Sequence, residues 1–213
     1  MSRSHHIALV GTALGAIVCL GCSGSSPASP TPSAATAGGP GATAASSTGG
    51  PEYANVSNQG GAGVYAENGA MLVRQPDGLR ASISMPRPEP GTYNYPAGKT
   101  AGHPEVFTLW AFVFNYPDLC TNPCNGDDIG PSRAAKGGVY NVGGHASSGN
   151  YLTIAGRIGI AEAPFGGAPL EAPATAEVHL AVAPHGDLDP TTLPTEFRTP
   201  TGPMSFWWIA VFH

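Results

Sequence analysis

Two stretches of the chain are almost entirely apolar, and they predict where the core lies. Residues 106–114 are apolar except for Thr108, and residues 204–212 form a second run, MSFWWIAVF. Short apolar runs rich in β-branched and aromatic side chains are typical of strands covered on both faces. We therefore predict two central strands here, lying next to each other in the sheet.

Other stretches alternate apolar and polar residues, which is the pattern of a strand with one buried face. In residues 78–85 the apolar face carries Leu79, Ala81, Ile83 and Met85. The same alternation predicts strands at 151–160 and 174–183, and a strand weakened by glycine is predicted at 136–142.

Asn68-Gly69 separates two short apolar segments, residues 63–67 and 70–74. Asn-Gly is the preferred pair of a two-residue β-hairpin turn, because both central residues of that turn need a positive φ. A hairpin is therefore predicted at this point. No stretch of residues 52–213 has a sustained helical period with capping residues. Short strands separated by Gly and Pro predict an all-β fold, a single antiparallel β-sandwich or barrel-like domain.

The N-terminal part of the chain differs sharply from this domain. An apolar run of 14 residues at positions 7–20 is shorter than the roughly 20 residues that a membrane-spanning helix needs. It matches the apolar segment of an export signal, so residues 1–21 are predicted to be a signal peptide. Residues 22–51 consist of Cys22 and uncharged small residues with proline, up to Pro51. Such a composition cannot form a core, so a flexible tether is predicted.

Leu20-Gly21-Cys22 directly after the apolar run resembles the lipobox of bacterial lipoprotein precursors. The resemblance implies cleavage before Cys22 and attachment of acyl chains such as palmitate, which would anchor the protein in the lipid bilayer of the cell membrane or the outer membrane, facing outside the cytoplasm. The family usually has Leu where this chain has Cys19. An ordinary secretory signal or an uncleaved N-terminal anchor is the alternative.

Charge excludes one class of partner. Only 11% of residues are charged, and the formal net charge is −5. A mildly acidic chain with scattered Lys and Arg has no basic patch for a phosphate backbone, so nucleic-acid binding is not expected.

The folded part holds two cysteines, Cys120 and Cys124. In an oxidising compartment an isolated pair most simply forms a disulfide. Metal binding and redox chemistry are the alternatives, but a single Cys-x-x-x-Cys pair is a poor zinc signature and differs from the Cys-x-x-Cys of redox proteins.

Histidines offer a candidate metal site of copper or zinc type, formed by His145, His179, His185 and Asp187. His179 and His185 share a strand face, but six residues of strand span about 20 Å, so they need a bend to share one ion. The alternative is that these histidines form only local hydrogen bonds.

Oxygen ligands crowd the cysteine loop and suggest a calcium site. The candidates are Asp118, Asp127 and Asp128, together with Asn122 and Asn125. The same residue types dominate ordinary turns, which is the alternative interpretation.

Trp207 and Trp208 are adjacent, so on a strand they point to opposite faces and one of them is a candidate for ligand stacking. No Gly-x-Ser-x-Gly motif is present, so no catalytic residue is assigned.

The segments TLWAFVFNYPDLC, GGH and AEVHLAVAPHG resemble a group of uncharacterised exported bacterial and fungal β-proteins. The resemblance covers most of residues 103–186 and implies a shared fold without an activity. It marks seven positions: Phe114, Asn115, Pro117, Cys120, His145, His179 and His185.

Together these patterns predict an exported, membrane-anchored lipoprotein. Its β domain is expected to bind an unknown envelope protein or a small ligand. The alternative is a metal-dependent redox enzyme that uses His145, His179 and His185.

Overall fold

The structure is a computed structural model that describes residues 49–95, 99–160 and 162–213. The predicted signal peptide, Cys22 and residues 23–48 of the predicted tether lie outside the described residues.

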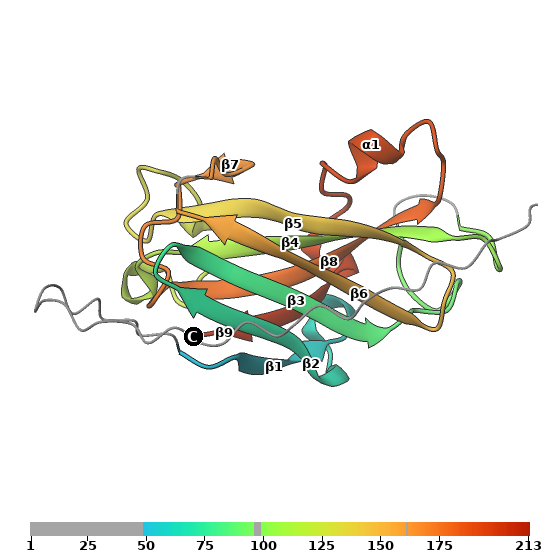
Figure 1. Cartoon of the computed structure of the whole chain (residues 1–213), viewed down its shortest axis with the longest axis horizontal. Helices are drawn as coiled ribbons and strands as arrows, with labels where there is room; N and C mark the ends of the chain where they lie inside the picture. The colour runs from blue at the N-terminus through green and yellow to red at the C-terminus, as the bar shows by residue number, and fades with distance from the viewer. Residues whose placement is uncertain (1–48, 96–98, 161) are drawn as a thin grey trace, which may run out of the picture. The chain divides into compact units, whose positions relative to one another are not determined.

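The described chain forms one antiparallel sheet of nine strands, which confirms the all-β prediction (Figure 1). The strands pair in the order β6-β3-β2-β1-β9-β8-β4-β5-β7. Their bounds are β1 Glu52–Ser57, β2 Val64–Gln75, β3 Gly78–Pro86, β4 Glu105–Phe114, β5 Gly137–Ser147, β6 Tyr151–Gly159, β7 Gly166–Gly167, β8 Glu177–Asp187 and β9 Trp208–Phe212. The helical elements are short: η1 Gln59–Gly61, η2 Pro117–Leu119, η3 Gly126–Asp128, α1 Leu193–Glu196 and η4 Met204–Phe206.

The sheet curls until strands from its two ends meet. β6 ends the strand order on one side and β5 lies near the other end, yet β5 and β6 pack closely at Val142 and Gly156. A Cβ atom on Gly156 would lie 1.9 Å from the carbonyl oxygen of Val142, so only glycine allows this approach. The sheet therefore wraps around a common interior.

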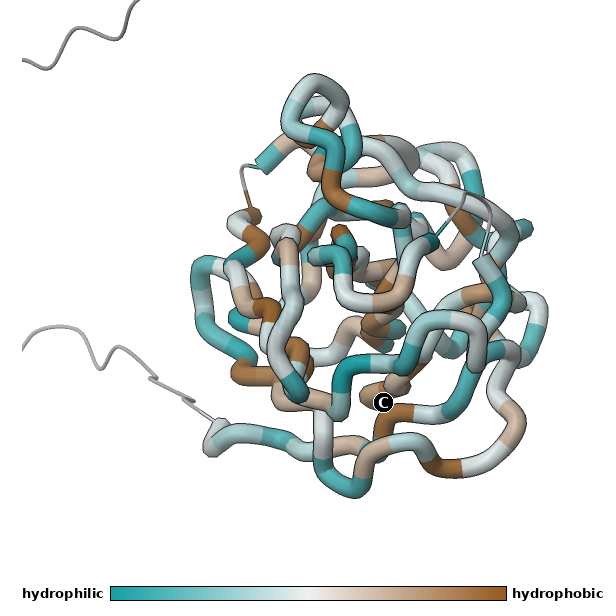
Figure 2. The backbone as a smooth tube through the Cα atoms, turned by 90° about the vertical axis from the view of Figure 1, so that its right-hand side faces the viewer, coloured by the Kyte–Doolittle hydropathy of each residue, from teal (hydrophilic) through white to brown (hydrophobic). Residues whose placement is uncertain are grey.

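One face of the strands fills that interior. In β3 the buried residues are Leu79, Ala81, Ile83 and Met85, which is the face predicted from alternation. Figure 2 shows hydrophobic residues interspersed with hydrophilic ones along the tube, as expected for strands with one buried face.

The other face of β4, β8 and β9 carries a second, smaller core. It contains Trp110, Ala181, Ala183 and Trp207, all buried. Phe165 packs against Trp110 with ring centroids 5.2 Å apart. β4 is therefore covered on both faces, as its sequence predicts.

The predicted hairpin at Asn68-Gly69 is wrong. β2 runs without interruption through this point, and the hairpin turn follows it at Pro76-Asp77. Asn68 adopts a φ of 48°, and its backbone N–H donates to Asn55 Oδ1 at 2.8 Å. Asn-Gly here accommodates a change of register between β1 and β2 instead of reversing the chain.

The second apolar run also differs from its prediction. Residues 204–206 form the turn η4, and only Trp208–Phe212 form a strand. β9 pairs with β8 and β1, so β8 lies between β9 and β4. The pattern was misleading because β8 buries its second face with small alanines, Ala181 and Ala183, in place of large apolar residues.

No helix in the described ranges is both long enough and apolar enough to cross a membrane.

Candidate functional site

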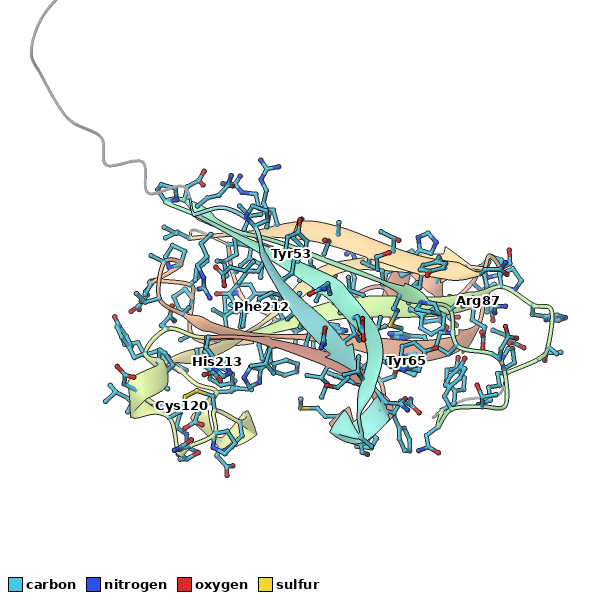
Figure 3. All side chains as sticks on the ribbon, turned by 90° about the horizontal axis from the view of Figure 1, so that it is seen from below. Tyr53, Tyr65, Arg87, Cys120, Phe212 and His213 are labelled. Atoms are coloured by element: carbon cyan, nitrogen blue, oxygen red, sulfur yellow. A yellow bond between two sulfur atoms is a disulfide. The ribbon has the colours of Figure 1, made fainter. Side chains whose placement is uncertain are left out.

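Two buried carboxylates mark the opposite ends of the β4–β8 pair. Glu177 begins β8 opposite Phe114, and Glu105 begins β4 opposite Asp187. The length of β4 between these pairs is about 30 Å at the usual rise of a strand. Figure 3 shows Cys120 and His213 near one end of the molecule and Arg87 near the other.

At the first end, Glu177 is held by two imidazoles. Its Oε1 accepts from His179 Nε2 at 2.6 Å, and its Oε2 accepts from His213 Nδ1 at 2.9 Å. His179 stands two residues further along β8, hence on the same face of the strand. β9 brings His213 to this place because Phe212 pairs with Val178.

The three side chains differ greatly in exposure. The side chains of Glu177 and His179 are 11% and 13% exposed, whereas that of His213 is 78% exposed. The ring of Phe114 packs against the His179 ring at 5.2 Å between centroids. A buried, oriented carboxylate therefore lies behind an imidazole that is open to solvent.

This end of the sheet carries a cleft of about 380 Å³. Glu177 and His213 form one wall, and the other wall is the loop after β4. That loop contains the Cys120–Cys124 disulfide, which confirms the predicted pairing. The loop residues lining the cleft are Pro117, Asp118, Cys120, Asn122, Pro123 and Cys124.

Hydrogen bonds also close the cysteine loop, and they use one of the side chains that were predicted to bind calcium. Asp128 accepts from the backbone N–H and hydroxyl of Thr121 and from the backbone N–H of Asn125, each at 3.0 Å. Burial opposes ionisation of Asp128, but these bonds hold its pKa below the ordinary value. Asp118, Asp127 and Asp128 do not converge as ligands of one ion, because Asp128 is committed to the loop itself and the described residues hold no ligand group suited to a metal. The turn interpretation is the one that the structure supports.

The predicted histidine site is not assembled either. His145 pairs with Phe107 and His179 with Phe112, so β4 separates their positions by five residues, about 17 Å along the strand. Among the described residues no group of three or more His, Cys, Asp or Glu side chains has a geometry suited to a metal ion. The fourth candidate, Asp187, accepts a hydrogen bond from the backbone of Thr100 at 2.8 Å.

His185 is a buried core histidine. Its Nε2 lies 2.9 Å from the hydroxyl of Thr108, which also accepts from Trp110 Nε1 at 2.8 Å. Its Nδ1 has no partner among the described residues. Burial lowers the pKa of His185 to about 4, so the ring is neutral at pH 7.

The predicted stacking site is wrong. Trp207 and Trp208 do point to opposite faces, but they are only 3% and 1% exposed. Trp207 Nε1 donates to the Thr201 carbonyl at 2.7 Å, in the segment that covers the outer face of the sheet. Trp208 packs inside the curled sheet, against Tyr65, Tyr93 and Phe107.

At the second end of the β4–β8 pair, Glu105 is completely buried and forms an ion pair. Arg87 Nη1 donates to its Oε2 at 3.0 Å, and the Tyr93 hydroxyl donates to its Oε1. Burial, this hydrogen bond and the Glu105 charge raise the pKa of Tyr93 well above its ordinary value. The sequence offered one signal for this site, a glutamate directly before the most apolar run, but no signal for its partners.

Asn115, one of the positions marked by the family resemblance, has a clear structural role. Its amide donates to the carbonyls of Lys136 and Pro169 at 2.8 and 2.9 Å and accepts from the backbone of Glu171 and Ala172 at 2.7 and 3.1 Å. The buried amide therefore joins three segments behind the cysteine loop.

No family model matches this chain, and neither a curated protein nor a solved structure matches it. The site is therefore interpreted from its own chemistry.

Proposed function

We propose that this chain is an exported lipoprotein, anchored through acylated Cys22 in the cell membrane or the outer membrane, whose β domain binds a small polar ligand. The cleft beside Glu177 is the observation that carries the binding proposal. Ligand sites are concave, with a few oriented polar groups between apolar surfaces, and their volumes usually start near 300 Å³. The cleft of about 380 Å³ fits this description.

The lining of the cleft favours a neutral ligand with several hydroxyl groups. Asp118 and Glu177 accept hydrogen bonds, the Asn122 amide both donates and accepts, and the exposed ring of His213 supplies a further nitrogen. Pro117 and Pro123 add apolar surface. A hydroxyl group both donates and accepts, so it suits this mixture better than a charged group does.

The disulfide supports export. Disulfides persist outside the cytoplasm and are rare in reducing compartments. Cys120 and Cys124 are paired, which agrees with an exported domain. The lipobox at Cys22 then supplies the anchor, because several acyl chains on one residue give durable membrane attachment.

The anchor is tested by the intact mass of the full-length product isolated from bacterial membranes, beside a Cys22→Ala variant. We expect the wild-type mass to show loss of the leader and addition of acyl chains, and the variant mass to lack both changes. An unacylated wild-type mass overturns the lipoprotein proposal.

The cleft is tested by calorimetric titration of the full chain with glucose and N-acetylglucosamine. We expect binding of at least one sugar, weakened about tenfold by Asp118→Ala, since one good hydrogen bond to a charged group accounts for roughly that factor. Asp127→Ala is the matched control, because Asp127 lies on the same loop but does not line the cleft. Absence of binding by both sugars, or equal loss in both variants, overturns the assignment.

A further inference from the structure

The Glu105 end of the sheet contains a pair of tyrosine rings set at a right angle. The Tyr93 and Tyr95 centroids lie 5.6 Å apart, and the ring planes meet at 89°. The Lys99 ammonium lies over this corner, 4.1 Å from the Tyr93 centroid and 5.4 Å from the Tyr95 centroid. Both distances are within the range of a cation–π interaction, about 6 Å.

Carboxylates make the same place favourable for a cation. The charges of Glu105, Asp187 and Glu196 add to burial in raising the pKa of Tyr95 far above its ordinary value, so all three act on this corner. Arg87 is already committed to Glu105. The ammonium of Lys99 therefore occupies a position that the surrounding rings and charges prepare for a positive group.

Lys99 itself is only loosely held there. Among the described residues its ammonium donates one hydrogen bond, to the Tyr93 carbonyl at 2.5 Å, and forms no salt bridge within 4.0 Å. A lysine side chain also loses much rotamer freedom when it is fixed in one position. A group that reaches the same rings and makes further bonds can replace it.

One polar atom at this corner has no hydrogen-bond partner among the described residues. The Tyr95 hydroxyl is buried, forms no hydrogen bond to the described residues, and lies against Gly186, where a Cβ atom would be 2.2 Å away. A buried hydroxyl without a partner is costly and rare in native proteins. An ammonium N–H donor from a ligand would satisfy it.

We propose that Tyr93 and Tyr95 form a binding site for the alkylammonium group of a ligand, and that Lys99 fills this site in the absence of the ligand. The site recognises a positively charged amine through two aromatic faces and through the nearby charges of Asp187 and Glu196, since Arg87 already compensates Glu105. It lies at the opposite end of the β4–β8 pair from the cleft at Glu177, so it is independent of the cleft and its ligand. Lys99 acts as an internal competitor that lowers the affinity for the ligand.

The test uses the full chain carrying Lys99→Ala, which removes the internal ammonium, with n-butylammonium as the probe. Binding is followed by tyrosine and tryptophan fluorescence, because Trp208 packs against Tyr93. We expect the variant to bind n-butylammonium at least tenfold more tightly than the wild type does. The neutral probe 1-butanol, which has a similar size and shape, should bind neither protein measurably.

Two further variants separate ring recognition from general loosening of the loop. Tyr95→Leu added to Lys99→Ala should weaken n-butylammonium binding at least fivefold, whereas Tyr93→Phe added to Lys99→Ala should retain it because the ring remains. Circular dichroism verifies that each variant is folded. Equal affinity in Lys99→Ala and wild type, or equal binding of 1-butanol, overturns the proposal even if Tyr95→Leu does not fold.

Discussion

Glu105 and Glu177 are both buried, both stand at the first residue of a central strand, and both have each oxygen hydrogen-bonded. They differ in the kind of partner. Arg87 carries a permanent charge next to Glu105, whereas the partners of Glu177 are imidazoles, whose charge depends on pH. Glu105 is also fully enclosed, and Glu177 borders an open cleft.

This difference separates a structural carboxylate from one that is available to a ligand. An arginine–carboxylate pair in the interior is compensated only while both partners are present. A carboxylate held by imidazole donors next to solvent can exchange or share those donors. We therefore expect substitutions at the Glu105 end to change stability strongly, and substitutions at the Glu177 end to change stability little and binding more.

The largest effect is expected from Arg87→Met. This substitution leaves the Glu105 carboxylate buried without a cation, which should lower the free energy of unfolding by about 3–5 kcal/mol. Urea unfolding of the full chain measures the change. The double variant Arg87→Met/Glu105→Leu is the control, because removing both charges should restore most of the loss. A single-variant effect below about 1 kcal/mol would contradict the structural role of this pair.

The second-largest effect on stability is expected from lowering the pH, and it arises at the Glu105 end of the sheet. The pKa of His185 is lowered to about 4 by burial, whereas an unfolded histidine has a pKa of about 6.5. Below pH 6.5 the unfolded chain binds a proton that the folded chain does not, so stability falls until pH 4. The full contribution is about 3 kcal/mol, present above pH 6.5 and lost at pH 4.

His185→Gln should remove this acid sensitivity, as urea unfolding at pH 7, 5.5 and 4.5 would reveal. His145→Gln is the control, since it removes an exposed histidine without touching the buried ring. An unchanged slope of stability with pH in His185→Gln would show that another group causes the acid loss.

At the cleft end, removal of the disulfide should have a smaller effect. Cys120 and Cys124 are only four positions apart in sequence. The bond closes a short loop, so its restriction of the unfolded chain stabilises the folded state by about 2 kcal/mol at most. The Asp128 hydrogen bonds close the same loop in the folded state. We expect the Cys120→Ala/Cys124→Ala variant to fold with a modest loss in urea unfolding. Failure to fold would mean that the loop depends on the bond.

The sequence predicted those parts of the fold that depend on local pattern. β3, β4 and β6 were located because alternation and apolar runs are properties of adjacent residues. The position of β8 between β9 and β4 was not predicted. It depends on the tertiary packing of the alanines Ala181 and Ala183, which a local sequence pattern does not reveal.

The sites were harder to predict for the same reason. Arg87 lies 18 residues from Glu105, and His213 lies 36 residues from Glu177, so strand register alone brings each pair together. The disulfide was predicted because its cysteines are close in sequence. The predicted metal site failed because strand pairing placed His145 and His179 at different levels of β4.

The smallest effect, and the sharpest comparison, is the same substitution at both ends. Glu177→Gln keeps one carbonyl acceptor for an imidazole N–H, and the other imidazole can accept from the new amide if it changes tautomer. The loss should be about 1 kcal/mol in urea unfolding, the worth of an ordinary hydrogen bond. Glu105→Gln is the matched variant and should cost about 3 kcal/mol or more, because it leaves the largely buried Arg87 charge without a carboxylate. Equal losses of stability in the two variants would mean that Glu177 has the same structural role as Glu105. Glu177 would then not be available to bind a ligand in the cleft.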